Sequence, residues 1–173
     1  MQETTFSREK YHITRERFWA SVIDGIVIIP IVVLNEYISE NQTSDVVLIA
    51  SLIIFTAVTY LYSVVMHAFF GQTIGKMLMR IRVFDVLEIP ITFRQAVLRD
   101  IVPLIAGVAL LCADVYFIST DRQNPDGYDA FYNIANNILL AWTVLELVSM
   151  LTNEKRRSIH DFIAGTVVVK LNK

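Results

Sequence analysis

Four long apolar stretches, separated by polar segments, make up most of the pattern of hydrophobic and polar positions along the chain. They cover approximately residues 18–38, 46–70, 101–119 and 132–151. A helix needs about 20 apolar residues to cross the hydrocarbon core of a bilayer. The pattern therefore predicts an all-α membrane protein, built as a bundle of four transmembrane helices. The alternative for each stretch is a buried helix of a soluble protein.

The amino-acid composition argues against the alternative of a soluble protein. Hydrophobic residues make up 54% of the 173 residues and charged residues only 18%, and the mean hydropathy is +0.50. Soluble domains carry roughly a quarter charged residues, and one core of this size could not bury so much apolar surface. The alternative is weakest for the second stretch, which holds one His and no formal charge. It stays open for the first and third, which each contain an Asp.

The distribution of positive charge predicts how the bundle is oriented. Of the 15 Lys and Arg residues, fourteen open or precede the first stretch, lie in the loop at 71–100, or follow the fourth. Only Arg122 lies in either of the other two loops. Because cationic loops stay cytoplasmic, both termini and the 71–100 loop are expected inside. The predicted parts are an N-terminal segment at 1–16, a membrane domain at 17–152 and a C-terminal tail at 153–173.

The same charges exclude nucleic acid as a partner. The basic residues fall into three separate blocks, each beside an apolar stretch, and the sequence pI of 5.9 is far from that of a nucleic-acid-binding domain. The expected partner is the lipid bilayer, with the chain as a multi-pass protein of the cell membrane.

The 71–100 loop begins with a segment that has helical spacing. Gly71 is expected to end the second transmembrane helix, as glycine commonly does. Residues 72–79 then predict a short amphipathic helix on the membrane surface, with Lys76 and Arg80 turned towards lipid head groups.

A small β-sheet is expected on the cytoplasmic face. "RIRVFD" at 80–85 alternates polar and apolar residues and is followed by "EIPITF" at 88–93, a pattern typical of a hairpin. Pro90 restricts the second arm to an edge strand or to no strand. The β-branched segment "AGTVVVKL" at 164–171 could add a strand, and an ordinary loop is the alternative to this sheet.

Several polar residues lie within the apolar stretches and divide into two layers. Asp24 is seven residues beyond Arg17, which is about 10 Å at 1.5 Å per residue. Glu146 lies at a similar depth from the same inner side, and so does His67. Asp114 belongs to the outer layer. A charge at mid-bilayer costs about 2.5–3.5 kcal/mol or more, so each of these side chains needs partners or water.

Two interpretations of the inner carboxylates stay open. Asp24 either forms a salt bridge with Arg17, Arg157 or another base, or acts as a protonatable or cation-binding carboxylate on a transport route. In a third interpretation, Asp24 lies near the membrane interface and is hydrated by water. Glu146 has no basic neighbour in sequence before Lys155, and burial without a partner raises the pKa of a carboxyl group. Glu146 is therefore the better candidate for a proton-linked role.

Motifs for catalysis or metal binding are weak. "GQTIGK" is one residue short of a phosphate-binding loop and has no Ser or Thr after its lysine. The pair His160 and Asp161 has no clustered His or Cys beside it. We therefore expect no catalytic residue, no metal and no cofactor, and we expect that the chain is not an enzyme.

Taken together, four segments of the chain resemble the RDD family of bacterial membrane proteins, and the resemblance runs from about Arg17 to Val169. The segments are "RFWASVID", "GQTIGKMLMRIRVFD", "ITFRQAVLRD" and "RRSIHDFIAGTVVV". The family is named for one arginine and two aspartates, and by position these correspond to Arg17, Asp24 and Asp161. If the tail folds back under the bundle, Asp161 is expected to meet Arg17 or the arginines of the 71–100 loop.

The resemblance implies a polytopic protein of the bacterial cytoplasmic membrane. The family is described as involved in transport of unknown ligands, and some members look like cation/proton antiporters. The leading hypothesis is therefore transport, with a monovalent cation or proton as ligand. Asp24 and Glu146 would handle the ions or protons, and Arg17 and Asp161 would form a lock. Further candidates are His67, Asp114 and His160.

Four helices leave little room for a transport route, so we expect a homo-oligomer. The alternative function is a non-catalytic membrane scaffold or regulatory protein, in which the polar cluster is only structural.

Overall fold

The computed structural model describes residues 10–120 and 125–171. Most of the predicted N-terminal segment lies outside the described residues. So do three basic residues that entered the charge count, namely Arg8, Arg122 and Lys173.

Four long helices coincide with the four apolar stretches. They are α2 (Thr14–Asn41), α3 (Asp45–Phe70), α6 (Ile101–Thr120) and α7 (Pro125–Thr152). All four are long and apolar enough to cross a membrane. The predicted helical bundle with four candidate spans is therefore confirmed, and each helix extends one to seven residues beyond its apolar stretch at one or both ends.

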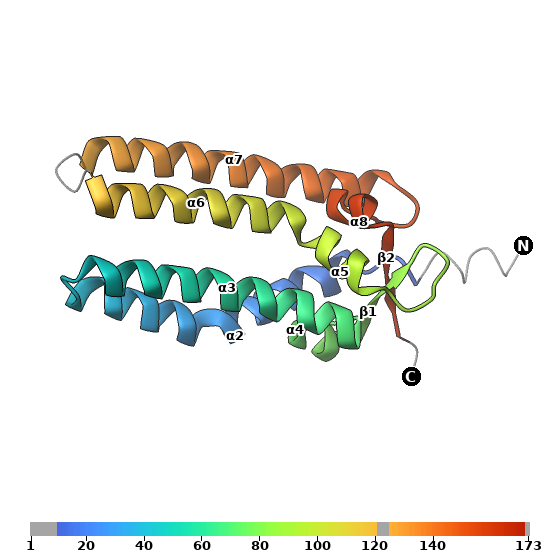
Figure 1. Ribbon diagram of the computed structural model, residues 1–173. Coiled ribbons are helices and arrows are strands. Elements are labelled where there is room, and N and C mark those ends of the chain that lie inside the picture. The colour runs from blue at the N-terminus through green and yellow to red at the C-terminus, as the bar shows by residue number, and fades with distance from the viewer. Residues whose placement is uncertain (1–9, 121–124, 172–173) are drawn as a thin grey trace, which may run out of the picture.

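The long helices run side by side, α2 next to α3 and α6 next to α7 (Figure 1). Between the two pairs, α3 contacts α6. Large apolar side chains along all four helices are exposed, among them Ile26, Leu61, Ile105 and Ile138. A bilayer would cover such surface without any further protein, so these side chains match a multi-pass membrane protein.

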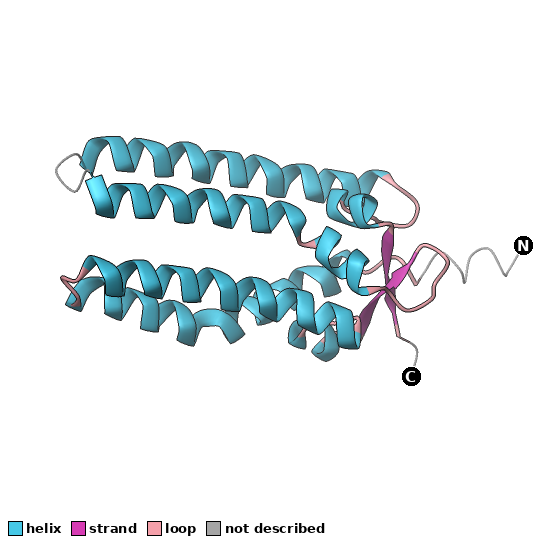
Figure 2. Cartoon of the chain, viewed as in Figure 1, coloured by secondary structure: helices cyan, strands magenta, loops and turns pink. Residues whose placement is uncertain are grey.

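Five short elements gather at one end of the bundle, and we call them together the cap (Figure 2). They are α4 (Ile74–Leu78), β1 (Ile81–Asp85), α5 (Phe93–Arg99), α8 (Ile159–Ala164) and β2 (Thr166–Lys170). The buried apolar core of the chain lies here, around Ile81, Val83 and Val168. Apolar side chains are thus buried in the cap, whereas many of those along the four long helices are exposed.

The sheet of the cap pairs β1 with β2, which are far apart in sequence. The strands are antiparallel, with Ile81 opposite Lys170 and Asp85 opposite Thr166. The predicted strand in the tail is therefore confirmed, but the predicted hairpin is wrong. Residues 88–93 contribute only a single bridge, between Phe84 and Pro90, because proline has no N–H to donate to a ladder.

The helix α4 crosses α2 at very short range. Gly75 is buried, and a Cβ atom at this position would lie 2.0 Å from the carbonyl oxygen of Ala20. Ala20 is itself buried in the cap core. Only a glycine permits this approach, so the crossing fixes α4 and the start of the 71–100 loop against the first span. The end of α3 at Gly71, which has φ 67°, is confirmed.

We predict that Gly75→Ala destabilises the protein, because the added methyl group must displace the backbone of α2. Overpacking of this kind costs about 1–3 kcal/mol. The matched control is Gly25→Ala, where a Cβ would meet nothing within 4 Å and where replacing a helical glycine stabilises by roughly 0.5–1 kcal/mol. The measurement is the melting temperature of each purified variant in detergent. Equal melting temperatures for both variants would contradict the crossing.

Candidate functional site

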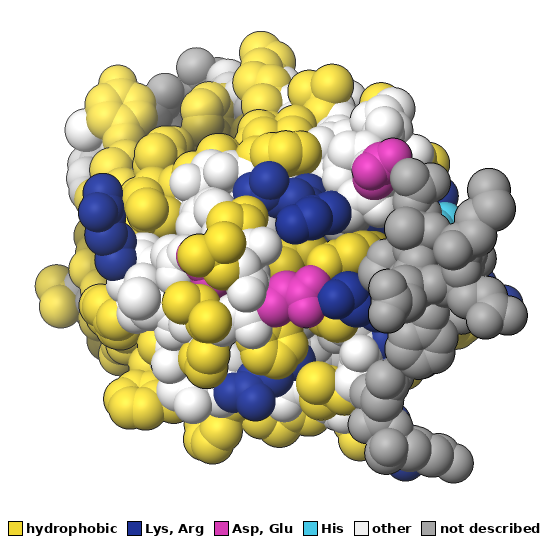
Figure 3. Space-filling view, turned by 90° about the vertical axis from the view of Figure 1, so that its right-hand side faces the viewer, with side chains coloured by type: hydrophobic (Ala, Val, Ile, Leu, Met, Phe, Trp, Pro, Cys, Tyr) yellow, Lys and Arg dark blue, Asp and Glu magenta, His cyan; other side chains and the backbone are white. Residues whose placement is uncertain are grey.

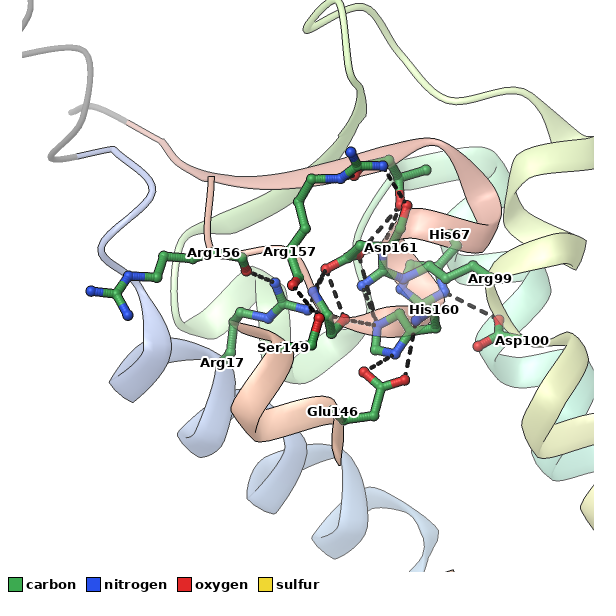
Figure 4. A network of polar contacts seen from close by, with 12 residues as sticks. Arg17, His67, Arg99, Asp100, Glu146, Ser149, Arg156, Arg157, His160 and Asp161 are labelled. Atoms are coloured by element: carbon green, nitrogen blue, oxygen red, sulfur yellow. Dashed lines mark hydrogen bonds and ion pairs between the residues drawn. The ribbon is translucent and has the colours of Figure 1, made fainter. Parts of the chain in front are cut away.

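A buried carboxylate between two guanidinium groups forms the centre of the cap (Figure 4). Asp161 on α8 has no exposed surface. Its Oδ2 atom lies 2.7 Å from Nη2 of Arg17 on α2, and its Oδ1 atom contacts Nη1 of Arg99 on α5. The tail therefore does fold back, and Asp161 meets both Arg17 and an arginine of the 71–100 loop. We call these three residues the clamp.

The local sequence explains why the carboxylate points inward. Asp161 is the third residue of α8, and its Oδ2 atom accepts hydrogen bonds from the backbone N–H of Ser158 at 3.0 Å and from the Ser158 hydroxyl at 2.9 Å. An acidic side chain at this position caps the helix start. Thr166, at the beginning of β2, adds a hydroxyl 3.3 Å from Oδ1. The carboxylate of Asp161 therefore both caps the start of α8 and pairs with the two arginines.

The clamp keeps Asp161 ionised although it is buried. Burial alone would raise the pKa of Asp161, but the positive charges of Arg17 and Arg99 outweigh burial and hold this pKa well below its ordinary value. Each guanidinium group also has a further acceptor. Arg17 donates to the carbonyl of Arg156 at 3.0 Å, and Arg99 donates to the hydroxyl of Thr166 at 2.9 Å.

Arg99 also contacts His160, and His160 in turn contacts Glu146 on α7. Nη2 of Arg99 lies 3.0 Å from Nε2 of His160. Because a guanidinium group can only donate, we assign Nε2 as the acceptor and place the ring proton on Nδ1. Nδ1 lies 2.9 Å from Oε2 of Glu146, and the His160 backbone N–H donates to Oε1 at 3.1 Å. We call Arg99, His160 and Glu146 the α7 relay.

A second histidine lies between a base and a carboxylate in the same way. Nζ of Lys76 is 2.5 Å from Nε2 of His67, and Nδ1 of His67 is 3.4 Å from Oδ2 of Asp100. The Ser63 hydroxyl donates to the same carboxylate oxygen at 2.9 Å. His67 is buried near the end of α3. We call Lys76, His67 and Asp100 the α3 relay.

The basic group of the α3 relay titrates near neutral pH. Burial, followed by the charge of Arg99, lowers the pKa of Lys76 to about 7. Burial would raise the pKa of Asp100, but its contacts with His67 and Ser63 lower it below the ordinary value. A lysine that gains and loses its proton near pH 7 can exchange that proton with the histidine ring beside it.

The two relays are joined through the backbone. Arg99 is the last residue of α5 and belongs to the α7 relay, while Asp100 follows it directly and belongs to the α3 relay. Arg99 also belongs to the clamp. A movement of this one arginine would therefore affect the clamp and the α7 relay together.

Asp24 does not join the clamp. Its Oδ1 atom accepts from the Tyr62 hydroxyl and from the Gly75 N–H, both at 2.8 Å, and its Oδ2 atom accepts from the Thr73 hydroxyl at 2.6 Å. All three donors are neutral, and within residues 10–120 and 125–171 no ion pair of Asp24 is found. Of the three family-signature residues, the structure brings together Arg17 and Asp161, while Asp24 holds the start of α4.

The remaining predicted polar residue lies far from the cap. Asp114 on α6 accepts hydrogen bonds from Tyr128, at 2.8 Å, and from Tyr132. Both tyrosines belong to α7, and Tyr128 stacks on Phe117. Asp114 therefore links α6 to α7 at the end opposite the cap. Among the described residues, no group of three or more His, Cys, Asp and Glu side chains could hold a metal ion.

Sequence reasoning missed Lys76 and Asp100, and it expected an arginine of the 71–100 loop beside Asp161 without identifying Arg99. Lys76 was expected to face lipid head groups, but its amino group is directed at His67. Arg99 and Asp100 lie in a segment that was not predicted to be helical. The signal that could have found them is the segment "ITFRQAVLRD", whose Thr92 and Gln95 form a capping box at the start of α5. Glu146, expected without a base nearby, has His160 as its partner.

Comparison with known proteins identifies the family. The model of the RDD family matches residues 13–165. Because this match covers most of the chain, the protein belongs to the RDD family, as the resemblance of its sequence motifs indicated. No curated protein and no solved structure matches the chain.

We predict that Asp161→Asn strongly destabilises the protein, because it leaves two guanidinium groups without their common counter-charge. Removing one partner of a buried ion pair costs about 3–5 kcal/mol. The matched control is Glu88→Gln, which removes a half-exposed ion pair with Lys10 that is worth about 1 kcal/mol or less. Chemical denaturation in detergent measures both changes. Similar losses for the two variants would show that the clamp contributes no more than a surface pair.

The α7 relay predicts a loss of stability on acidification. Burial, followed by the charge of Arg99, lowers the pKa of His160 from 6.5. The unfolded chain therefore binds more protons than the native protein below pH 6.5, so the contribution of His160 is complete above this pH and declines as pH falls. We expect the melting temperature to decrease from about pH 7 to about pH 5. His160→Gln should make this decrease smaller, and an unchanged slope would contradict the assignment.

Proposed function

We propose that this RDD family membrane protein exchanges a monovalent cation for protons across the bacterial cytoplasmic membrane. The single observation that carries the proposal is the pair of relays, since each places a histidine between a cationic side chain and a carboxylate at the cap end of the bundle. In the α3 relay, Nε2 of a neutral His67 can accept a proton from Lys76 while Nδ1 releases one. In the α7 relay Arg99 keeps its proton, and only His160 and Glu146 can exchange one.

The α3 relay supplies a group that changes charge in the physiological range. Lys76 has a pKa of about 7, so a modest change in pH changes its protonation. Its proton can pass to His67 across a contact of 2.5 Å. The step to Asp100, whose Oδ2 atom lies 3.4 Å from Nδ1 of His67, requires these two side chains to move closer. This geometry supports proton transfer between the loop end of α3 and the start of α6.

The α7 relay connects protonation to the clamp. In the described geometry, Nε2 of His160 accepts a hydrogen bond from Arg99. If His160 takes up a proton, Nε2 becomes a donor, and two donors then face each other. The contact with Arg99 would be repulsive, and Arg99 also holds Asp161. Protonation of the relay therefore weakens the clamp, which we assign as the lock of the exchange cycle.

Asp24 is the group that we assign to the cation. Its carboxylate lies in a spanning helix, and its partners Tyr62, Thr73 and Gly75 are neutral donors that stabilise the anion without cancelling its charge. Glu146, by contrast, has the titratable His160 as its partner. The two carboxylates therefore divide the predicted tasks, with Asp24 for the cation and Glu146 for the proton.

We place the cap on the cytoplasmic side. Within the described parts of the chain, every Lys and Arg lies in the segments 10–17, 76–99 and 155–170, which contain or adjoin the cap. The view onto this end shows Lys and Arg side chains among apolar and acidic ones (Figure 3). Positively charged segments favour the cytoplasm, which supports this orientation.

A membrane scaffold or regulatory protein is the second candidate function. The observation that favours it is that Asp161 and Asp24 both have several hydrogen-bond donors, as structural carboxylates do. Under this interpretation the relays only position the cap, and purified protein in vesicles moves no ions.

We predict that Lys76→Met and Glu146→Gln abolish cation-driven proton movement. The measurement is the change of internal pH in proteoliposomes after addition of sodium or potassium. Lys76→Arg should also be inactive, because arginine keeps its charge at every accessible pH. Glu88→Gln, on the exposed side of the cap, is the matched control and should retain wild-type rates.

The stability of the same variants separates function from folding. Because burial disfavours the charged amino group of Lys76, Lys76→Met should melt at or above the wild-type temperature near neutral pH. Loss of flux in a protein of undiminished stability supports a proton-carrying role. If wild-type vesicles show no flux, or if Lys76→Met transports normally, the exchange proposal fails.

A further inference from the structure

The helix α7 exposes amide side chains along a membrane span. Asn133, Asn136 and Asn137 are all exposed, and within the described part of the chain their side chains form no hydrogen bond. The nearby Thr143 is also exposed, and its hydroxyl donates only to the Leu139 carbonyl of its own helix. The leucines and isoleucines around them can face lipid hydrocarbon without cost. An amide cannot, because hydrocarbon offers no hydrogen-bond partner for its N–H and C=O groups.

The depth of these residues makes lipid a poor partner. Asn136 is sixteen residues from Thr152 at the cap end of α7, which is about 24 Å at 1.5 Å per residue. The hydrocarbon core is about 30 Å thick, so Asn136 lies inside it, towards the side opposite the cap. A polar group left without a hydrogen bond at such a depth is costly.

The exposed positions also follow the spacing of a helix–helix contact. Asn133, Asn136, Leu140, Thr143 and Leu147 alternate at intervals of three and four residues, the repeat that keeps one helix face against another. All five are exposed, and we call them the α7 stripe. Tyr132 and Glu146, which contact Asp114 and His160, border one edge of the stripe, because each lies three or four residues from a stripe residue.

We propose that the α7 stripe is the surface through which two copies of this chain pair in the membrane. Copies inserted in the same direction and related by a two-fold axis along the membrane normal bring equal depths of α7 together. Each Asn then meets an Asn of the second copy. An amide both donates and accepts, so identical amides satisfy each other.

The second copy fits the stripe better than lipid does. Lipid tails offer neither donors nor acceptors, whereas polar residues commonly hydrogen-bond across helices within membranes. The proposal is independent of the proposed exchange function, since none of the stripe residues belongs to the clamp or to either relay. A negative result in one experiment therefore leaves the other intact.

Cysteine cross-linking in native membranes tests the pairing. The natural Cys112 is exposed on α6, so the parent variant is Cys112→Ala. Leu140→Cys then places a thiol on the stripe, and Leu145→Cys is the matched control. Both leucines are more than half exposed, at 63% and 54%, but they lie on different faces of the helix. Oxidation should give a covalent dimer with Leu140→Cys and little or none with Leu145→Cys.

A second variant tests the role of the amides. Asn136→Leu should raise the dimer dissociation constant by roughly threefold to thirtyfold, which corresponds to the loss of a typical interhelical hydrogen bond. Its melting temperature as a monomer should not change, because the side chain is exposed. Equal cross-linking of the two cysteine variants, no cross-link at Leu140→Cys, or unchanged dimerisation of Asn136→Leu would overturn the proposal.

Discussion

The structure depends on one buried carboxylate, that of Asp161, held between the guanidinium groups of Arg17 and Arg99. The three residues come from the first span, from the loop between the second and third spans, and from the tail after the fourth. Large parts of the four long helices expose their side chains, so much of their surface is left for lipid. The clamp and the small apolar core around Val83 and Val168 therefore hold together the ends of helices that are otherwise loosely joined.

Arg99 connects this structural centre to the chemistry of the site. Its positive charge helps to keep Asp161 ionised and lowers the pKa of both His160 and Lys76. Its guanidinium group also donates a hydrogen bond to Nε2 of His160. A buried arginine cannot lose its proton under ordinary conditions. Its fixed charge therefore acts on the protonation of titratable residues in both relays. The same feature makes the clamp sensitive to the protonation of His160.

The sequence was informative where the signal was local. Apolar length located all four spans, Gly71 marked the end of α3, and the β-branched tail predicted β2. The hairpin prediction was wrong because Pro90 leaves the second arm without a donor, so that β1 pairs with the distant tail. The relays could not be predicted, since the contacts of Lys76 with His67 and of Glu146 with His160 join residues brought together only by folding. The meeting of Arg17 and Asp161 was expected from the family motif rather than from spacing.

The most direct test of this account is a double-mutant cycle between Arg17 and Asp161. The free energy of unfolding in detergent would be measured for the wild type, Arg17→Met, Asp161→Asn and the double variant. Contacting residues in one charged network couple by up to about 3 kcal/mol, and we predict a coupling of about 1.5 kcal/mol or more in this buried pair. Effects that add to within about 0.5 kcal/mol would show that the two side chains act independently and would contradict the clamp.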